Sequence, residues 1–248
     1  MPPRAFCESL LPDSIALDDS EAHHLQHVLR LKPGDQVCLF DGCGTEADAV
    51  ITRISRREVF CAVSDRRKSP PAAFGRLTVL ASPPKADRLK WMIEKLTEIG
   101  VERLILLQTE RTIVTPGESR IEKLRSSVVS ACKQCRRNDL MQLSPLQTMT
   151  SVLADLHSER LQGELWIAHP GTEPEFQSNV VSPTVQPRFL LIGPEGGFTN
   201  DEFQAAIKAG ARVAAWPNTV LRIETAAIVF AARLLAGPLK TTSLPPAE

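Results

Sequence analysis

The sequence predicts an α/β protein in two parts, a small β-barrel over residues 1–70 and a parallel sheet with helices over residues 76–240. In the first part, short β-type runs are separated by the turns Lys32-Pro33-Gly34-Asp35 and Asp41-Gly42. In the second part, short apolar runs alternate with segments whose apolar residues recur at helical spacing, which is typical of a parallel sheet. Residues 71–75, within a charged and proline-rich stretch, have the composition of a linker.

The first part contains one helical stretch and several strands. The helical stretch lies within residues 17–31, where Leu25, Val28 and Leu29 share one face. Strands are expected at residues 37–40, 49–54 and 59–63.

The second part alternates strands with helices. Strands are expected at residues 77–81, 104–107, 165–168, 189–192 and 213–216. Helices are expected at residues 87–99, 119–135, 199–210 and 223–235, and a long proline-rich loop at 170–187. This alternation alone predicts a doubly wound sheet, because threaded chains are nearly absent among protein folds.

The composition argues against several classes of protein. The 29 basic and 29 acidic residues cancel, and no apolar stretch approaches the ~20 residues that span a bilayer. The opening residues lack the apolar segment of a signal peptide, and the six cysteines show no disulfide or zinc-knuckle spacing. We therefore expect reduced thiols in a cytoplasm. Basic residues outnumber acidic ones between residues 71 and 160, which hints at an anionic partner.

The first motif is the loop Gly193-Pro194-Glu195-Gly196-Gly197, which follows an apolar strand and precedes a capped helix. Glycine lets a backbone approach a ligand closely, and proline fixes the direction of the entering chain. The loop belongs to the carboxyl edge of a sheet, where α/β proteins bind ligands. It has neither a Walker lysine nor the Rossmann glycine spacing. A tight structural turn is the alternative interpretation.

The second motif is the segment VLRIETA at residues 220–226, which also follows a short strand. It places Arg222, Glu224 and Thr225 at the start of an apolar helix. Two such loops at adjacent strand ends could enclose one small molecule. The alternative is that Arg222 and Glu224 form an ordinary charge pair at the start of a helix.

Together these motifs resemble the SPOUT-type S-adenosylmethionine-dependent RNA methyltransferases, and most closely the bacterial 16S ribosomal RNA (uracil-1498-N3)-methyltransferases. The most specific blocks are residues 192–198 and 221–226. Further blocks that resemble the family lie at residues 4–6, 24–35, 40–42, 85–88, 95–101, 110–111 and 134–136.

The resemblance implies a PUA-like RNA-binding β-barrel domain at residues 1–70 and a SPOUT-type parallel sheet with a trefoil knot at residues 76–240. The knot follows from the resemblance only. The resemblance also implies S-adenosylmethionine as cofactor, with 16S rRNA in the small ribosomal subunit as substrate. It further implies a cytoplasmic homodimer with no metal and no membrane partner, and the apolar face of residues 226–235 fits a dimer interface.

The methylation chemistry, together with the resemblance, suggests the site residues. Arg222 would stabilise negative charge on the uracil ring, and Glu195 would orient the cofactor or accept a proton. Cofactor binding is expected at Ala168, His169, Ile192, Gly193, Pro194, Gly196, Gly197, Trp216, Val220, Leu221 and Thr225. Contacts with RNA phosphates are expected at Arg30, Lys85, Arg88, Arg111, Arg136 and Arg137.

The sequence departs from the family at two places. Trp216-Pro217-Asn218 stands where the family usually has a Leu-Gly pair, and Lys133-Gln134-Cys135 replaces Glu-Gln-Ser. Three alternatives stay open: a methyltransferase with another RNA target, a non-catalytic RNA-binding protein with a decayed pocket, and a doubly wound nucleotide-binding protein.

Two further patterns resemble metal sites. Cys132 and Cys135 form a CxxC, but no partner pair accompanies them and they fall within a helical pattern. His23 and His27 have the i, i+4 spacing of metal ligands, with no further ligand nearby in the sequence. We expect a buried helix face for the cysteines and surface or RNA contact for the histidines.

Overall fold

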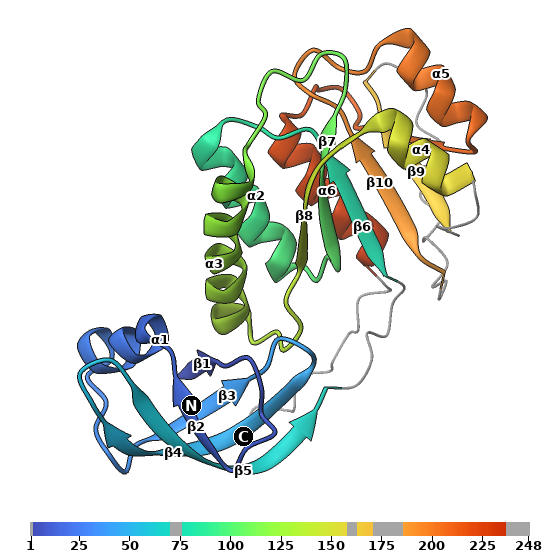
Figure 1. The fold of residues 1–248 in the computed structure, drawn as a ribbon. Helices are drawn as coiled ribbons and strands as arrows, with labels where there is room; N and C mark the ends of the chain where they lie inside the picture. The colour runs from blue at the N-terminus through green and yellow to red at the C-terminus, as the bar shows by residue number, and fades with distance from the viewer. Residues whose placement is uncertain (1, 70–75, 158–162, 171–185, 237–248) are drawn as a thin grey trace, which may run out of the picture. The chain divides into compact units, whose positions relative to one another are not determined.

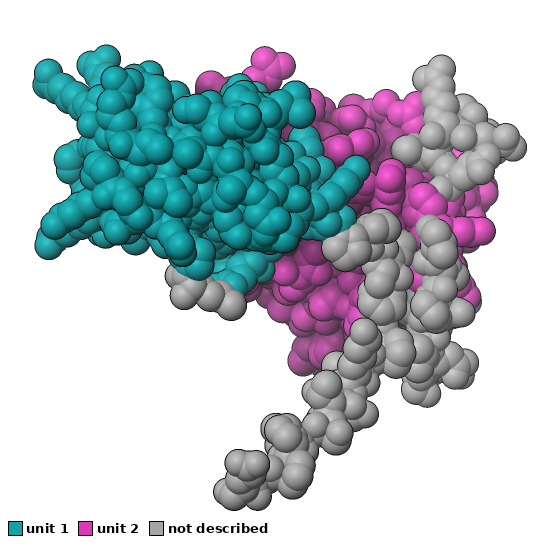
Figure 2. All heavy atoms as spheres, turned by 90° about the horizontal axis from the view of Figure 1, so that it is seen from below, with its two compact units in different colours: residues 1–71, 122–141 teal, residues 72–121, 142–248 magenta. Residues whose placement is uncertain are grey.

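The computed structural model describes residues 2–69, 76–157, 163–170 and 186–236. The expected linker at 71–75, most of the loop at 170–187 and residues 237–240 lie outside the described residues. The contacts divide the chain into two compact units (Figure 2). One contains Met1–Pro71 with Glu122–Met141, and the other contains Ala72–Ile121 with Gln142–Glu248.

The first unit is built on a five-stranded sheet in the order β1-β3-β4-β5-β2 (Figure 1). The strands are β1 (Arg4–Phe6), β2 (Ser14–Leu17), β3 (Gln36–Phe40), β4 (Thr45–Ile54) and β5 (Val59–Lys68). All neighbours are antiparallel except β1 and β3. The sequence did not predict β1 or β2, since β1 has only three residues and the last residue of β2, Leu17, falls within the expected helical stretch.

The expected helical stretch at residues 17–31 is shorter than predicted and splits into two elements. Leu17 ends β2, where it pairs with Val59. Helix α1 (Asp19–His23) follows, and the π-helix η1 (His24–Val28) continues it. Leu25 is fully buried, whereas Val28 and Leu29 are exposed. The common face predicted for these three residues is wrong, since a π-helical turn advances by a larger residue step than an α-helical one.

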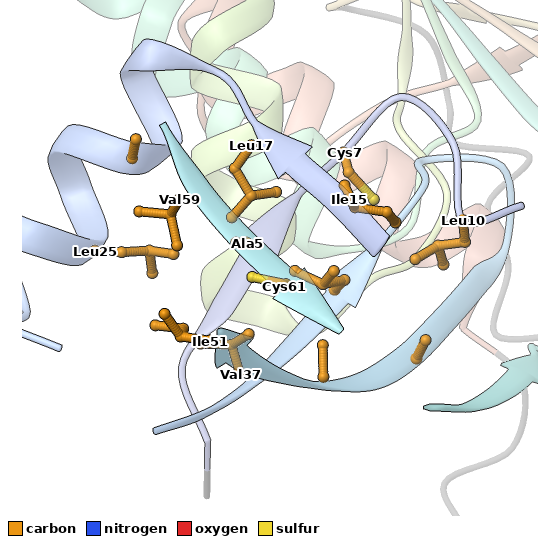
Figure 3. Packing of buried hydrophobic residues seen from close by; sticks show 14 residues of the cluster. Ala5, Cys7, Leu10, Ile15, Leu17, Leu25, Val37, Ile51, Val59 and Cys61 are labelled. Carbon is orange, nitrogen blue, oxygen red and sulfur yellow. The ribbon is translucent and has the colours of Figure 1, made fainter. Parts of the chain in front are cut away.

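The core of the first unit gathers side chains from all five strands of its sheet and from α1 and η1 (Figure 3). Leu17 of β2, Leu25 of η1 and Ile51 of β4 are almost fully buried in it. Cys7 and Cys61 belong to the same cluster and behave as small apolar groups.

Most of helix α3 (Glu118–Cys135) and the residues after it, up to Met141, belong to the first unit and make polar contacts with its residues 1–71. Lys133 Nζ lies 2.7 Å from Oε1 of the buried Glu21. Asp139 forms an isolated β-bridge with Cys43, and the Leu140 amide donates to the Gly42 carbonyl at 2.9 Å. These contacts explain why Glu122–Met141 groups with the first unit.

The second unit contains a six-stranded sheet in the order β11-β9-β10-β6-β7-β8, in which every pair is parallel. The strands are β6 (Leu77–Ala81), β7 (Arg103–Gln108), β8 (Gln142–Thr148), β9 (Glu164–Ala168), β10 (Arg188–Ile192) and β11 (Arg212–Ala214). The helices are α2 (Ala86–Glu98), α4 (Met149–His157), α5 (Asn200–Lys208) and α6 (Ile223–Leu235). The parallel α/β sheet confirms the predicted fold class.

The helices of the second unit cover both faces of this sheet (Figure 1). Helices α4 and α5 pack over a cluster that includes Leu80, Ile167 and Leu191. Helix α6 packs against α2, β6 and β10. Within the apolar face at residues 226–235, Ala226, Ala227, Phe230, Ala231 and Leu234 are buried in the unit, whereas Ile228, Val229, Ala232 and Leu235 are half-buried. The dimer interface expected there stays a prediction.

Because all six strands are parallel, their carboxyl ends lie at one edge of the sheet. The chain leaves this edge after β9, β10 and β11, so the loops that follow these strands are brought together. None of the helices among the described residues combines the length and apolarity that crossing a bilayer requires.

Candidate functional site

The glycine loop is a tight turn between β10 and α5. The Gly197 amide donates to the Pro194 carbonyl at 2.8 Å, and Gly197 adopts a φ of 70°. A capping box then starts α5: the Glu202 amide donates to Thr199 Oγ1 at 3.3 Å, and the Thr199 amide donates to the Glu202 carboxylate at 2.9 Å. The loop therefore enters the helix in a fixed direction.

The two residues Glu110 and Arg111, which follow β7, form hydrogen bonds with the glycine loop and with the start of α5. Arg111 Nη1 donates to the Gly196 carbonyl at 2.7 Å, and the Glu110 amide donates to Glu202 Oε1 at 2.8 Å. Gly193 packs so closely that a Cβ there would lie 3.0 Å from the ring of the buried Phe198. These contacts give the loop one well-defined conformation.

The second loop joins β11 to α6. Asn218 adopts a φ of 69°, a left-handed conformation that asparagine tolerates better than most residues. Trp216 and Val220 are exposed, with 43% and 79% of their surface accessible. Arg222 occupies the N-cap position of α6, and its side chain makes no capping hydrogen bond. A guanidinium only donates hydrogen bonds, so it cannot accept one from the free amides at the start of the helix.

The two loops and the end of β9 line one cavity of about 380 Å³. The cavity brings together both predicted catalytic residues, Arg222 and Glu195. It also contains every predicted cofactor residue except Thr225, which lines a neighbouring groove.

Sequence reasoning missed several residues of this cavity. Its wall includes Phe198 and, from α6, Ile223, Ala226 and Phe230. These positions have an ordinary core pattern in the sequence, and only the three-dimensional arrangement shows that they face a cavity. Pro170, Ala214 and Thr219 complete the set of missed residues.

His169, directly after the end of β9, also lines the cavity. Its amide donates to the Ala214 carbonyl at 3.0 Å, and its ring lies 4.4 Å from that of Phe203. Its Nδ1 atom is buried and has no hydrogen-bond partner among the described residues. A buried polar atom without a partner is costly, so this nitrogen is available to a bound molecule.

The predicted RNA-contacting residues fall in both units. Arg30, Arg136 and Arg137 belong to the first unit, where Arg30 and Arg136 are exposed. Lys85 and Arg111 belong to the second unit and are exposed. Arg88 is half-buried and ion-paired: its Nη1 lies 3.5 Å from Glu224 and its Nη2 lies 3.9 Å from Glu195.

The two metal-like patterns do not form a metal centre among the residues with described positions, where no group of three potential ligands occurs. Cys132 lies buried in α3, and burial raises the pKa of its thiol to about 11. The ring centroids of the exposed His23 and His27 lie 4.7 Å apart, with the rings tilted by 47°.

Both parts of the chain match domains of known RNA methyltransferases. Residues 70–235 match a family model of the RNA methyltransferase domain, and residues 17–64 match a model of the RNA methyltransferase PUA domain. Ribosomal RNA small subunit methyltransferase E of Mycobacterium bovis is 30% identical over 231 residues, which cover 90% of this chain and 88% of that protein. The Bacillus subtilis protein of the same name is 26% identical, with 90% and 93% covered.

A solved structure agrees with these sequence matches. The crystal structure of ribosomal RNA small subunit methyltransferase E from Neisseria gonorrhoeae, bound to S-adenosyl methionine, superposes with a TM-score of 0.83 and 25% identity. It covers 94% of this chain and 96% of its own. The resemblance drawn from the sequence is thereby confirmed. This chain belongs to the RNA methyltransferase family that includes ribosomal RNA small subunit methyltransferase E.

Proposed function

We propose that this protein transfers a methyl group from S-adenosylmethionine to N3 of a uridine in 16S rRNA within the small ribosomal subunit. Uracil-1498 is the target that the family resemblance indicates. One observation carries the proposal: in a chain of this family, the two motif loops line a single cavity at the carboxyl edge of the parallel sheet.

The residues of the cavity fit S-adenosylmethionine. The volume of about 380 Å³ falls within the range of ~300–1,000 Å³ of small-molecule sites. Phe230 and Ala226 supply an apolar wall, backbone groups of the glycine loop supply hydrogen bonds, and His169 Nδ1 is an unused buried polar atom. S-adenosylmethionine would be held by Ala168, His169, Ile192, Gly193, Pro194, Gly196, Gly197, Trp216, Val220, Leu221 and Thr225.

When bound, this cofactor supplies a methyl group already activated on a sulfonium. The protein then has to place a uracil in line with it and stabilise the negative charge that develops as the imide loses its proton. Arg222 supplies the positive charge, and Glu195 orients the reactants from the opposite loop. Both side chains line the cavity, which supports these roles.

RNA recognition involves both parts of the chain in this proposal. Residues 1–70 act as a PUA-like RNA-binding domain, residues 71–75 as a linker and residues 76–240 as the catalytic domain with a trefoil knot. RNA phosphates are contacted by Arg30, Lys85, Arg88, Arg111, Arg136 and Arg137. The protein acts in the cytoplasm as a homodimer. The PUA-domain match at residues 17–64 supports the RNA-binding role.

The test is methyl transfer from labelled S-adenosylmethionine to small ribosomal subunits from cells that lack this protein, with the modified nucleoside identified by mass. We expect 3-methyluridine. Cofactor binding without transfer would indicate another RNA target, and no binding would indicate a decayed pocket. In the same assay Arg222→Ala should slow the methyl-transfer step by about 10²-fold or more, and an unchanged step would remove Arg222 from the mechanism.

A further inference from the structure

Glu224 is a buried carboxylate with an unused oxygen at the edge of the cofactor cavity. The residue is only 4% exposed, although it belongs to the first turn of α6. Its Oε1 lies 3.5 Å from Arg88 Nη1, whereas Oε2 has no hydrogen-bond partner in the described parts of the chain. A buried charge is normally paired at both oxygens, so the free Oε2 points to a ligand that completes it.

Glu224 lines an open groove of about 630 Å³ that adjoins the cofactor cavity. Both hollows share Arg222, so a molecule in the groove would lie beside the cofactor. Trp91 of α2 also lines the groove and is 45% exposed. An exposed indole face next to paired charges is the arrangement on which an unstacked base can lie.

The charges of the groove match the reacting edge of uracil. That edge presents O2 as an acceptor, N3–H as a donor and O4 as an acceptor. Arg88 and Arg222 offer only donors, Glu224 offers a buried acceptor, and the exposed Asp87 is a second carboxylate in the lining. Cytosine presents an unprotonated N3 and an amino group, which would face a carboxylate and a guanidinium unfavourably.

We propose that this groove binds the target uracil by its Watson–Crick edge and that Glu224 Oε2 accepts the N3 proton. The inference rests on the proposed methylation at N3. Trp91 stacks on the base, and the two arginines hold O2 and O4.

The reaction is a proton transfer followed by a displacement. The N3–H proton moves to Glu224 Oε2, and the N3 electron pair forms the new bond to the methyl carbon. The electrons of the broken sulfur–methyl bond return to sulfur. Negative charge spreads over O2 and O4 meanwhile, where both guanidinium groups stabilise it. The proton then leaves Glu224 to solvent, which restores the site.

The first test is Glu224→Gln, with Glu94→Gln on α2 as the matched control. Glu94 is also ion-paired, with Lys90 at 3.9 Å, but it does not line the groove. We expect single-turnover methyl transfer to fall by about 10²-fold or more in Glu224→Gln, the usual range for a lost general base, with no fall in the control. Calorimetry should give an unchanged dissociation constant for S-adenosylmethionine in both variants.

A second measurement separates chemistry from structure. In subunits assembled from transcribed RNA with 5-fluorouridine in place of uridine, the N3 proton is more acidic and needs less help to leave. The defect of Glu224→Gln should therefore shrink by about tenfold or more, in line with Brønsted behaviour. By equilibrium binding, the wild type should prefer subunits with uridine over cytidine at the target position, and Glu224→Gln should lose that preference.

Three outcomes would overturn the inference: a Glu224→Gln rate within about threefold of the wild type, a defect that 5-fluorouridine leaves unchanged, or an intact preference for uridine. If Glu224→Gln does not fold, the same measurements on Glu224→Asp decide, because it retains a displaced carboxylate. The wild-type product keeps the two proposals apart. If the wild type does not form 3-methyluridine, the proposed function fails, and if it does while Glu224→Gln is active, only the role of Glu224 fails.

Discussion

Asn138 shows how a single buried amide organises part of the first unit. Its Oδ1 accepts from Arg4, while its Nδ2 donates to Ser69 Oγ at 2.8 Å and to Glu46 Oε2 at 3.2 Å. Arg4 also donates to Glu46 at 2.9 Å. This cluster joins residues more than 130 positions apart in the sequence. Local sequence patterns do not reveal contacts between residues so far apart, so the sequence could not predict that Arg4 and Asn138 are partners.

The cluster makes the stability of the protein depend on pH. Partial burial opposes ionisation of Glu46, but hydrogen bonds from Arg4 and Asn138 outweigh it and lower its pKa from 4.5. A carboxyl group whose pKa is lowered in the folded state stabilises the protein when the pH lies above its pKa in the unfolded chain. This stabilisation is lost as the pH falls through its pKa in the folded state. We expect the free energy of unfolding to decrease below about pH 4.5 less steeply in Glu46→Gln than in the wild type.

Denaturant unfolding at a series of pH values would measure this difference. Glu58→Gln, an exposed change in the same unit, serves as the control and should follow the wild type. Parallel curves for Glu46→Gln and the wild type would contradict the role given to this cluster.

The cysteines should differ strongly in reactivity. Burial, with a smaller effect from Asp41, raises the pKa of Cys7 to about 12, and burial raises the pKa of Cys61 and of Cys132 to about 11. The thiolate is the nucleophile, so these three should resist iodoacetamide at neutral pH, whereas the exposed Cys43 should react first. Peptide mass mapping with Cys43→Ser as control would check this, and equal labelling of Cys7 and Cys43 would contradict it.

Among the elements, the two motif loops were predicted better than much of the regular structure. The glycine spacing and the segment at 220–226 predicted residues that share one cavity, because loops at strand ends carry their chemistry in their own sequence. In contrast, β8 and α4 were not predicted. Strand β8 is an edge strand that contains Gln142, Ser144 and Pro145, so it lacks the apolar run by which a central strand is found.

The two glycines of the first loop offer a matched pair of variants. In Gly193→Ala the new Cβ would lie 3.0 Å from the ring of the buried Phe198, which has little room to move. In Gly196→Ala it would lie 3.3 Å from Cδ of the exposed Arg111, which can adjust. The strain in Gly193→Ala should displace the loop. If this displacement costs ~1.4 kcal/mol of binding free energy, the affinity for S-adenosylmethionine should fall about tenfold.

Isothermal titration calorimetry on both variants would measure these affinities, and Gly196→Ala should show a clearly smaller loss. A larger loss in Gly196→Ala than in Gly193→Ala would contradict the packing argument.

In the whole molecule, the first unit is not a continuous stretch of chain. It consists of Met1–Pro71 and Glu122–Met141, while Ala72–Ile121 between them belongs to the second unit. We therefore expect residues 1–71 and 72–248, expressed as two separate polypeptides in one cell, to purify together. Lys133 and Asn138 on one piece would hold Glu21 and Arg4 on the other.

Affinity purification through a tag on one piece would test this association. Lys133→Ala combined with Asn138→Ala should reduce recovery of the untagged piece, and Gln134→Ala, an exposed change on the same helix, should not. Recovery of the tagged piece alone from the unaltered pair would contradict the expectation.

The Asn138 cluster also has a consequence for how the protein is made. On the ribosome, Arg4 and Glu46 emerge long before Asn138, which supplies their shared amide. At translation speeds of about 5–20 residues per second, the first unit waits several seconds for its last segment. During that interval β6, α2 and β7 leave the exit tunnel, so parts of the second unit are synthesised before the first unit can be completed.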